Sequence, residues 1–77
     1  MSSIDDFDVN DVVTAGDVTY VGKEDKSGRW CVQKVDESSG TVITYATVLN
    51  NAEVTSYAAA WAARESLTYG TAGAAFR

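Results

Sequence analysis

The sequence predicts an α+β domain in which a three-stranded antiparallel β-meander is followed by one α-helix, with extended N- and C-terminal arms. Three runs rich in β-branched and aromatic residues predict the strands, because such residues fit a pleated, half-buried surface. Two short polar links separate these runs, and one alanine-rich segment follows them. We therefore expect an acidic N-terminal arm (1–16), a meander-plus-helix domain (17–70) and a C-terminal tail (71–77).

The N-terminal arm mixes acidic and apolar side chains. Its charge density opposes independent collapse, but it holds too many apolar residues for a purely solvated tail. This combination fits an arm that becomes ordered against a partner, and a flexible terminus is the alternative. We expect its apolar side chains to reach neighbouring chains: Ile4, Phe7 and Val9.

The three predicted strands span 17–22, 29–35 and 41–49. The links between them end at Gly28 and Gly40, which suits hairpin loops that contain one residue with positive φ. Short links require antiparallel neighbours, since parallel strands need a long crossover. The predicted arrangement is therefore a meander.

The third strand is apolar on both faces. Alternation places Ile43, Tyr45 and Leu49 on one face, and Val42, Ala46 and Val48 on the other. Such a strand implies that both faces of the sheet are covered. One helix covers only one face, so a partner chain or the N-terminal arm must cover the second. We expect Val42 and Val48 to lie in that protein interface, together with Phe76 near the C-terminus.

The alanine-rich segment predicts a helix from about Glu53 to Thr68, capped at its start by Thr55 or Asn51 and at its end by Gly70. Aromatic residues of the sheet and helix form either a ligand-stacking surface or the core, and the core is the favoured interpretation for a domain of this size. The residues expected to pack helix against sheet are Tyr20, Trp30, Tyr45, Tyr57, Trp61, Arg64, Leu67 and Tyr69.

Charge and hydropathy exclude several partners. The net charge is −5, with six scattered basic residues against eleven acids, which argues against binding to nucleic acid or anionic lipid. The longest apolar run, 57–63, is too short to cross a bilayer. The N-terminus lacks the basic and then apolar layout of a signal peptide, so we expect synthesis in the cytoplasm without secretion by that route.

The residues for catalysis are also missing. Histidine is absent, and the single cysteine, Cys31, lies between Trp30 and Val32 in a predicted strand, as a small buried apolar residue does. We therefore expect no catalytic residue, no cofactor and no enzymatic activity. One cysteine permits no disulfide within the chain, so a domain this small is expected to gain stability from neighbouring copies or other chains.

One segment resembles a calcium loop. Asp6, Asp8 and Asn10 alternate, and Asp17 stands where the last ligand would fall. The glycine that such a loop requires is replaced by Asp11. A solvated acidic arm is therefore the favoured interpretation, and we expect no metal site.

The segment 20–70 resembles a group of small structural proteins of tailed bacteriophages. The resemblance rests on Tyr20-Val21-Gly22, on the tryptophan-led run 30–35, on Ile43-Thr44-Tyr45-Ala46 and on a closing motif. That motif runs Trp61-Ala62-Ala63-Arg64-Glu65-Ser66-Leu67-Thr68-Tyr69-Gly70, with Ala63 where the family usually has an acidic residue. The resemblance implies a virion component whose partners are other virion structural proteins.

Two functions follow as expectations. The first is a bacteriophage virion structural protein, a homo-oligomer or symmetric array, that docks on capsid, neck, tail or fibre by protein–protein contacts. Capsid decoration and a tail or fibre component are its two forms. The alternative is a small free binding or regulatory module that presents a sheet edge to a host protein. An enzyme would require a pocket with at least two converging carboxylates.

Overall fold

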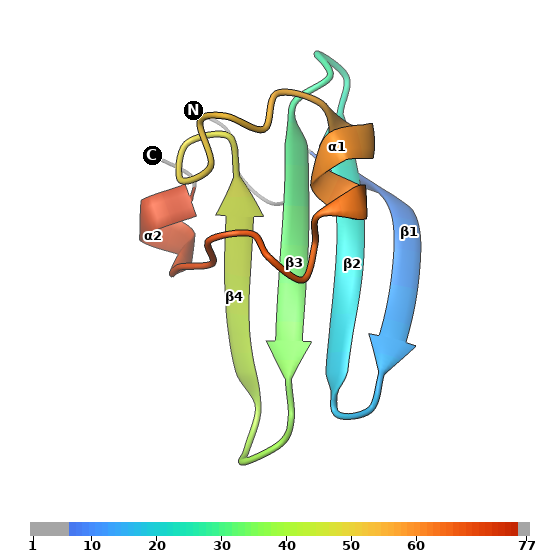
Figure 1. Cartoon of the computed structure of the whole chain (residues 1–77), viewed down its shortest axis with the longest axis vertical. Coiled ribbons are helices and arrows are strands. Elements are labelled where there is room, and N and C mark those ends of the chain that lie inside the picture. The colour runs from blue at the N-terminus through green and yellow to red at the C-terminus, as the bar shows by residue number, and fades with distance from the viewer. Residues whose placement is uncertain (1–6, 76–77) are drawn as a thin grey trace.

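The computed structural model describes residues 7–75, which form a four-stranded antiparallel sheet with two short helices (Figure 1). The strands follow one another in the order of the chain, so the sheet is a meander. This confirms the predicted α+β class and the antiparallel meander. The elements are β1 (Phe7–Ala15), β2 (Val18–Asp25), β3 (Trp30–Asp36), β4 (Val42–Thr47), α1 (Tyr57–Ala62) and α2 (Ala72–Ala75).

The predicted strand count was wrong, because residues 7–15 of the expected N-terminal arm form β1. This strand pairs with β2 on either side of a bulge between Val9 and Asp11. Gly16, with a φ of 63°, makes the tight turn that joins the two strands. The acids do not prevent pairing, since Asp8 and Asp11 keep exposed side chains while their backbones join the sheet. Residues 1–6 of the expected arm, with Ile4, lie outside the described part of the chain.

The β2–β3 hairpin is closed by the carboxylate of Asp25. This carboxylate accepts hydrogen bonds from the backbone N–H groups of Ser27 and Arg29, at 3.0 and 2.8 Å, and from both side chains. The guanidinium of Arg29 also forms an ion pair with it at 2.6 Å. Burial raises the pKa of Asp25, but the hydrogen bonds and the charge of Arg29 outweigh burial and hold the pKa below its ordinary value.

The Asp25→Asn variant is therefore expected to be less stable than the wild type at pH 7, because a carboxamide cannot accept all of these hydrogen bonds. The lowered pKa means that the ionised carboxylate stabilises the folded state above the pKa of the unfolded chain, and that this stabilisation is lost as pH falls through the folded pKa. The stability difference should shrink below about pH 4. Urea unfolding from pH 7 to pH 3 measures it, and a difference that is constant with pH would contradict the assignment.

The core lies between the sheet and α1. Trp30, Val32, Ala46 and Ala60 are almost completely buried there, and Tyr20 is 8% exposed. The indole Nε1–H of Trp30 donates to the carbonyl of Val54 at 2.8 Å, which satisfies the one polar group of that side chain. The side chains of Val18 and Tyr20 on β2, and of Trp30 and Val32 on β3, thus share the face that α1 covers.

The helix is shorter than the predicted span 53–68. Ser56 is its N-cap and accepts from the Ala59 N–H at 3.3 Å, so neither Thr55 nor Asn51 caps it. After Ala63 the chain turns, and both polar atoms of the Asn51 side chain bond to the backbone of Thr68. Gly70 is not a helix cap, because it exchanges two backbone hydrogen bonds of 2.9 Å with Tyr45 on the edge of β4. The helix ends at Ala62, and the following segment crosses the sheet to reach these contacts at the edge of β4 (Figure 1).

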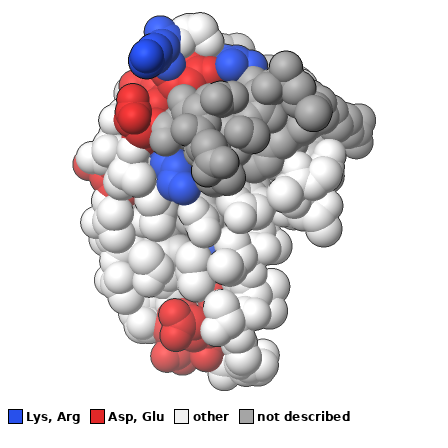
Figure 2. Space-filling view, turned by 180° about the vertical axis from the view of Figure 1, so that it is seen from behind, with Lys and Arg blue, Asp and Glu red and all other residues white. Residues whose placement is uncertain are grey.

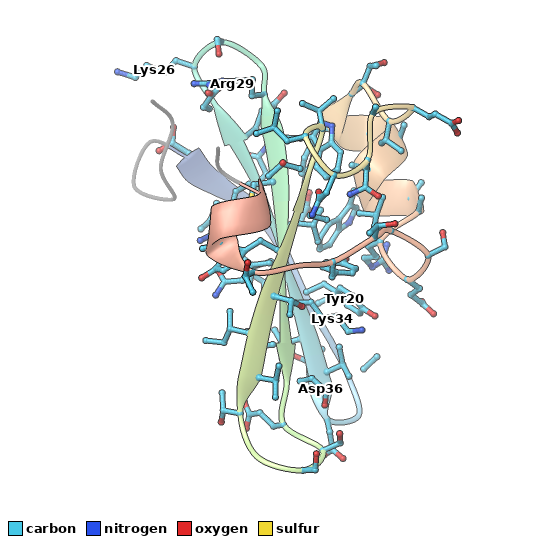
Figure 3. All side chains as sticks on the ribbon, turned by 90° about the vertical axis from the view of Figure 1, so that its left-hand side faces the viewer. Tyr20, Lys26, Arg29, Lys34 and Asp36 are labelled. Carbon is cyan, nitrogen blue, oxygen red and sulfur yellow. The ribbon has the colours of Figure 1, made fainter. Side chains whose placement is uncertain are left out.

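The expected extended tail also contains a helical turn, α2, which packs beside β4. The hydroxyl of Thr47 donates to the carbonyl of Ala75 at 2.6 Å, and Ala75 is 1% exposed. This contact fastens α2 on the side of the sheet opposite α1 (Figure 3). Phe76 lies outside the described residues.

Candidate interaction surface

Most of the residues expected to pack helix against sheet do so. Tyr20 and Trp30 belong to the buried core, and half-buried side chains of the helix and the following turn pack against it: Tyr57, Trp61, Leu67 and Tyr69. Arg64 joins them, since its guanidinium lies 4.8 Å from the ring centre of Trp61 and its carbonyl accepts from the Tyr69 hydroxyl at 2.6 Å.

Tyr45 is the exception. The register pairs Tyr45 with Gln33, and Gln33 with Val21, all on the face that α1 does not cover. The prediction that Tyr45 packs against the helix was therefore wrong, although alternation along the third predicted strand separates Tyr45 from Ala46. The signal that placed it wrongly was its aromatic character, which is typical of cores but does not determine which face a residue occupies.

Cys31 lies on this second face and is fully buried. Burial raises the pKa of its thiol to about 12. We expect the folded chain to resist an aromatic disulfide reagent at pH 8, since a thiolate is the reactive species. Labelling should be complete, at one equivalent per chain, in about 6 M guanidinium chloride. Rapid labelling of the folded chain would show that the thiol is accessible.

A shallow pocket of about 450 Å³ lies between the segment that follows β4 and the turn after α1. Glu53 is the one carboxylate among its lining residues, and asparagine side chains and small or apolar residues make up the rest. The pocket therefore does not hold the pair of carboxylates that glycoside hydrolysis uses.

Of the calcium-like pattern, Asp8 and Asn10 lie on β1 and Asp17 lies in the turn that follows, whereas Asp6 lies outside the described residues. Asn10 donates to Glu24 at 3.1 Å, and Asp17 lies at the far end of the strand. Within residues 7–75, no group of three or more acidic or cysteine side chains is placed to hold a metal ion. In the same part of the chain, no helix is long and apolar enough to cross a membrane.

The surface that stands out is the lower part of the sheet face opposite α1. We call it the open face. Two cross-strand rows form it: one contains Val12, Val21, Gln33 and Tyr45, and the other Thr14, Thr19, Val35 and Ile43. None of these eight side chains is charged. Val12 is 61% exposed and Ile43 is 45% exposed, although both are β-branched residues paired within the sheet.

Charged residues lie only beyond the two ends of the open face. At the upper end, Lys23 of β2 lies in the next cross-strand row, with Cys31 and Thr47, where α2 packs. Below it, the exposed residues Asp17 and Glu37 are neighbours, since the Glu37 N–H donates to the Asp17 carbonyl at 2.9 Å. Figure 2 shows this face with its lower, uncharged area uncovered and acidic groups at the bottom. The open face is thus an uncharged strip between a basic and an acidic end.

The other expected interface residues are placed separately. Val9 is 59% exposed on β1, and Phe7 begins that strand. Val42 is 55% exposed at the start of β4, on the same side as α1. Val48 packs against the helix-side core, so the structure does not place it in an exposed interface. Val12, Val21 and Val35 were not predicted as surface residues, because residues 7–15 were expected to form an arm and the second face of the sheet was not recognised as a four-stranded surface.

Comparison of the chain with protein-family models, with curated proteins and with solved structures found no match. Function is therefore inferred from the geometry of the open face and of the elements around it.

Proposed function

We propose that this chain is a structural protein of a bacteriophage virion that docks on capsid, neck, tail or fibre through the open face of its sheet. The observation that carries the proposal is a strip of eight uncharged side chains, six of them β-branched, on a chain with a net charge of −5. Three of the β-branched residues in the strip, Val12, Thr14 and Ile43, are exposed. Exposed apolar patches on small domains mark contact surfaces.

The fold explains why this surface needs a partner. The segments that pack on the sheet are divided between its two sides, with α1 over β2 and β3 and α2 beside β4. Val12 and Ile43 stay largely exposed in this arrangement. Covering apolar surface stabilises a complex by about 25 cal/mol per Å² before ordering costs, so docking would recover stability that the isolated sheet lacks.

The resemblance to small structural proteins of tailed bacteriophages supports the type of assembly. Its closing motif contains Trp61, Arg64, Leu67 and Tyr69, the residues that fasten α1 and the following turn to the sheet. These residues keep α1 packed on one face of the sheet, so the opposite face remains for contacts with other proteins. Repeated weak contacts in a symmetric particle would add to firm attachment.

Mass spectrometry of purified particles, with copy-number determination, tests the proposal. We expect the chain to co-purify at a fixed number of copies per particle, high for capsid decoration and low for a neck, tail or fibre component. Recovery of the chain only in the soluble fraction would overturn the proposal.

A matched pair of variants tests whether the open face makes the contact. Ile43→Lys places a charge on the open face, whereas Val42→Lys places one at the neighbouring, similarly exposed position on the α1 side. Both should change stability by less than about 0.5 kcal/mol, as exposed substitutions usually do. We expect only Ile43→Lys to reduce the copy number per particle, and equal effects of the two would exclude the open face.

The second candidate, a free binding module that presents a sheet edge to a host protein, has weaker support. The outer edge of β1 carries exposed Asp8 and Asp11, and charged side chains on an edge strand discourage the pairing of another strand. The edge of β4 is occupied at Tyr45 by Gly70. Such a module would be recovered free of particles in the experiment above.

A further inference from the structure

The charges at the two ends of the open face are arranged in a self-complementary way. Along β2, Lys23 lies three residues above Tyr20, and Asp17 lies three residues below it. Glu37 lies beside Asp17 and adds a second negative charge at that end. Among residues 7–75 the one ion pair is Arg29–Asp25, so these three side chains have no such partner there.

From this layout we propose that the open face binds the open face of a second copy of the chain, with the strands of the two sheets antiparallel. A two-fold axis across the strands at the level of Tyr20 exchanges the two ends of the face. It brings Lys23 of each copy to Asp17 and Glu37 of the other, twice by symmetry. Aligned sheets pack about 10 Å apart, a gap that uncharged β-branched and aromatic side chains fill.

The opposite orientation is disfavoured by the same charges. With parallel strands, Lys23 would face Lys23, and the acidic ends would meet each other. Like charges placed across an interface suppress association, whereas complementary ends fix the register. The other nearby cations do not alter this pattern. Arg29 is paired with Asp25, and Lys34 lies on the α1 side, 5.3 Å from the ring centre of Tyr69.

The size of the face sets the expected affinity. Four strands about 4.8 Å apart, over two cross-strand rows of about 6.6 Å each, give roughly 250 Å² per copy. Stable dimers bury about 800 Å² per partner, so this contact belongs to the weak class. We expect a dissociation constant between about 10 μM and 1 mM. The pair would therefore form mainly at high local concentration, as on a particle.

Sedimentation equilibrium on the isolated full chain, in about 50 mM salt and up to about 1 mM protein, tests the proposal. The test compares two variants with complementary charges. Lys23→Glu makes both ends of the open face acidic, and the double variant Asp17→Lys, Glu37→Lys makes both ends basic. Each alone should self-associate at least tenfold more weakly than the wild type. An equimolar mixture of the two should form heterodimers at least as tightly as wild-type homodimers.

Matched controls separate contact from net charge. Lys26→Glu changes the net charge as Lys23→Glu does, but Lys26 is exposed in the β2–β3 hairpin, beyond the face (Figure 3). The double variant Glu53→Lys, Glu65→Lys matches the basic one at exposed positions of the α1 side. Near-UV circular dichroism checks that each variant is folded.

A chain that stays monomeric at every concentration would overturn the proposal. So would equal effects of Lys23→Glu and Lys26→Glu, or a mixture that associates no better than its components. The inference rests on the proposed function only in assigning the open face to protein contact. If the chain dimerises in solution but does not associate with particles, only the proposed virion function is wrong. If it associates with particles but stays monomeric in solution, only the proposed pairing is wrong.

Discussion

Replacing Gly22 by alanine is expected to destabilise the domain by about 3 kcal/mol, because α1 rests directly on this residue. A Cβ atom at position 22 would overlap the hydroxyl of Tyr57 and approach two ring carbons of Trp61 at 2.7 and 2.9 Å. The tyrosine hydroxyl can shift only by giving up its 2.6 Å hydrogen bond to Asp11, and the indole ring is stacked on the Tyr57 ring. The helix would have to lift from β2.

Guanidinium unfolding of the wild type and Gly22→Ala, followed by circular dichroism, measures the loss. Gly73→Ala is the matched control, since the nearest atom to its added Cβ is 3.9 Å away and alanine favours the helical turn α2. Its stability should equal or exceed that of the wild type. A loss below about 1 kcal/mol for Gly22→Ala would mean that α1 does not seat on β2 in this way.

Trp30→Ala is expected to have the second large effect, a loss of about 3–5 kcal/mol. Trp30 is the largest fully buried side chain, at 1% exposure. Its removal leaves a cavity between sheet and helix and leaves the Val54 carbonyl without the indole donor. A domain of this length has a total stability of about 4–12 kcal/mol, so the variant is expected to lose a large part of it and, at the lower end of that range, to be partly or wholly unfolded at 25 °C.

Thermal unfolding followed by the fluorescence of the remaining Trp61 reports this loss. Trp30→Phe provides a graded comparison: it keeps most of the apolar volume and should cost less, mainly through the lost hydrogen bond. Leu49→Ala removes a large side chain that is 56% exposed and should change stability by less than about 0.5 kcal/mol. A Trp30→Ala variant as stable as Leu49→Ala would place the core elsewhere.

Local sequence determined the middle of the fold. The hairpins at Gly28 and Gly40 were predictable because a positive φ and a polar link act within a few residues, and both glycines have positive φ, at 87° and 105°. The faces of Trp30 and Val32 followed from the two-residue period of a strand. The apolar residues on both faces of the third predicted strand also indicate cover on the second face by a partner chain or the N-terminal arm, and this stays a prediction.

Tertiary structure decided how the two ends of the chain fold onto the sheet and which residues form the open face. Residues 7–15 contain Asp8, Asn10 and Asp11, residue types that are rare in strands, and they form a strand here by pairing with the edge of β2. The helix ends early because Asn51 and Tyr45, distant in sequence, hold the backbone of Thr68 and Gly70. Tyr45 and Val48 exchanged their expected roles for a related reason. The apolar character of a single residue indicates only that its side chain is better buried than exposed. The register of the neighbouring strands and the path of the covering segments decide on which face of the sheet that side chain is buried.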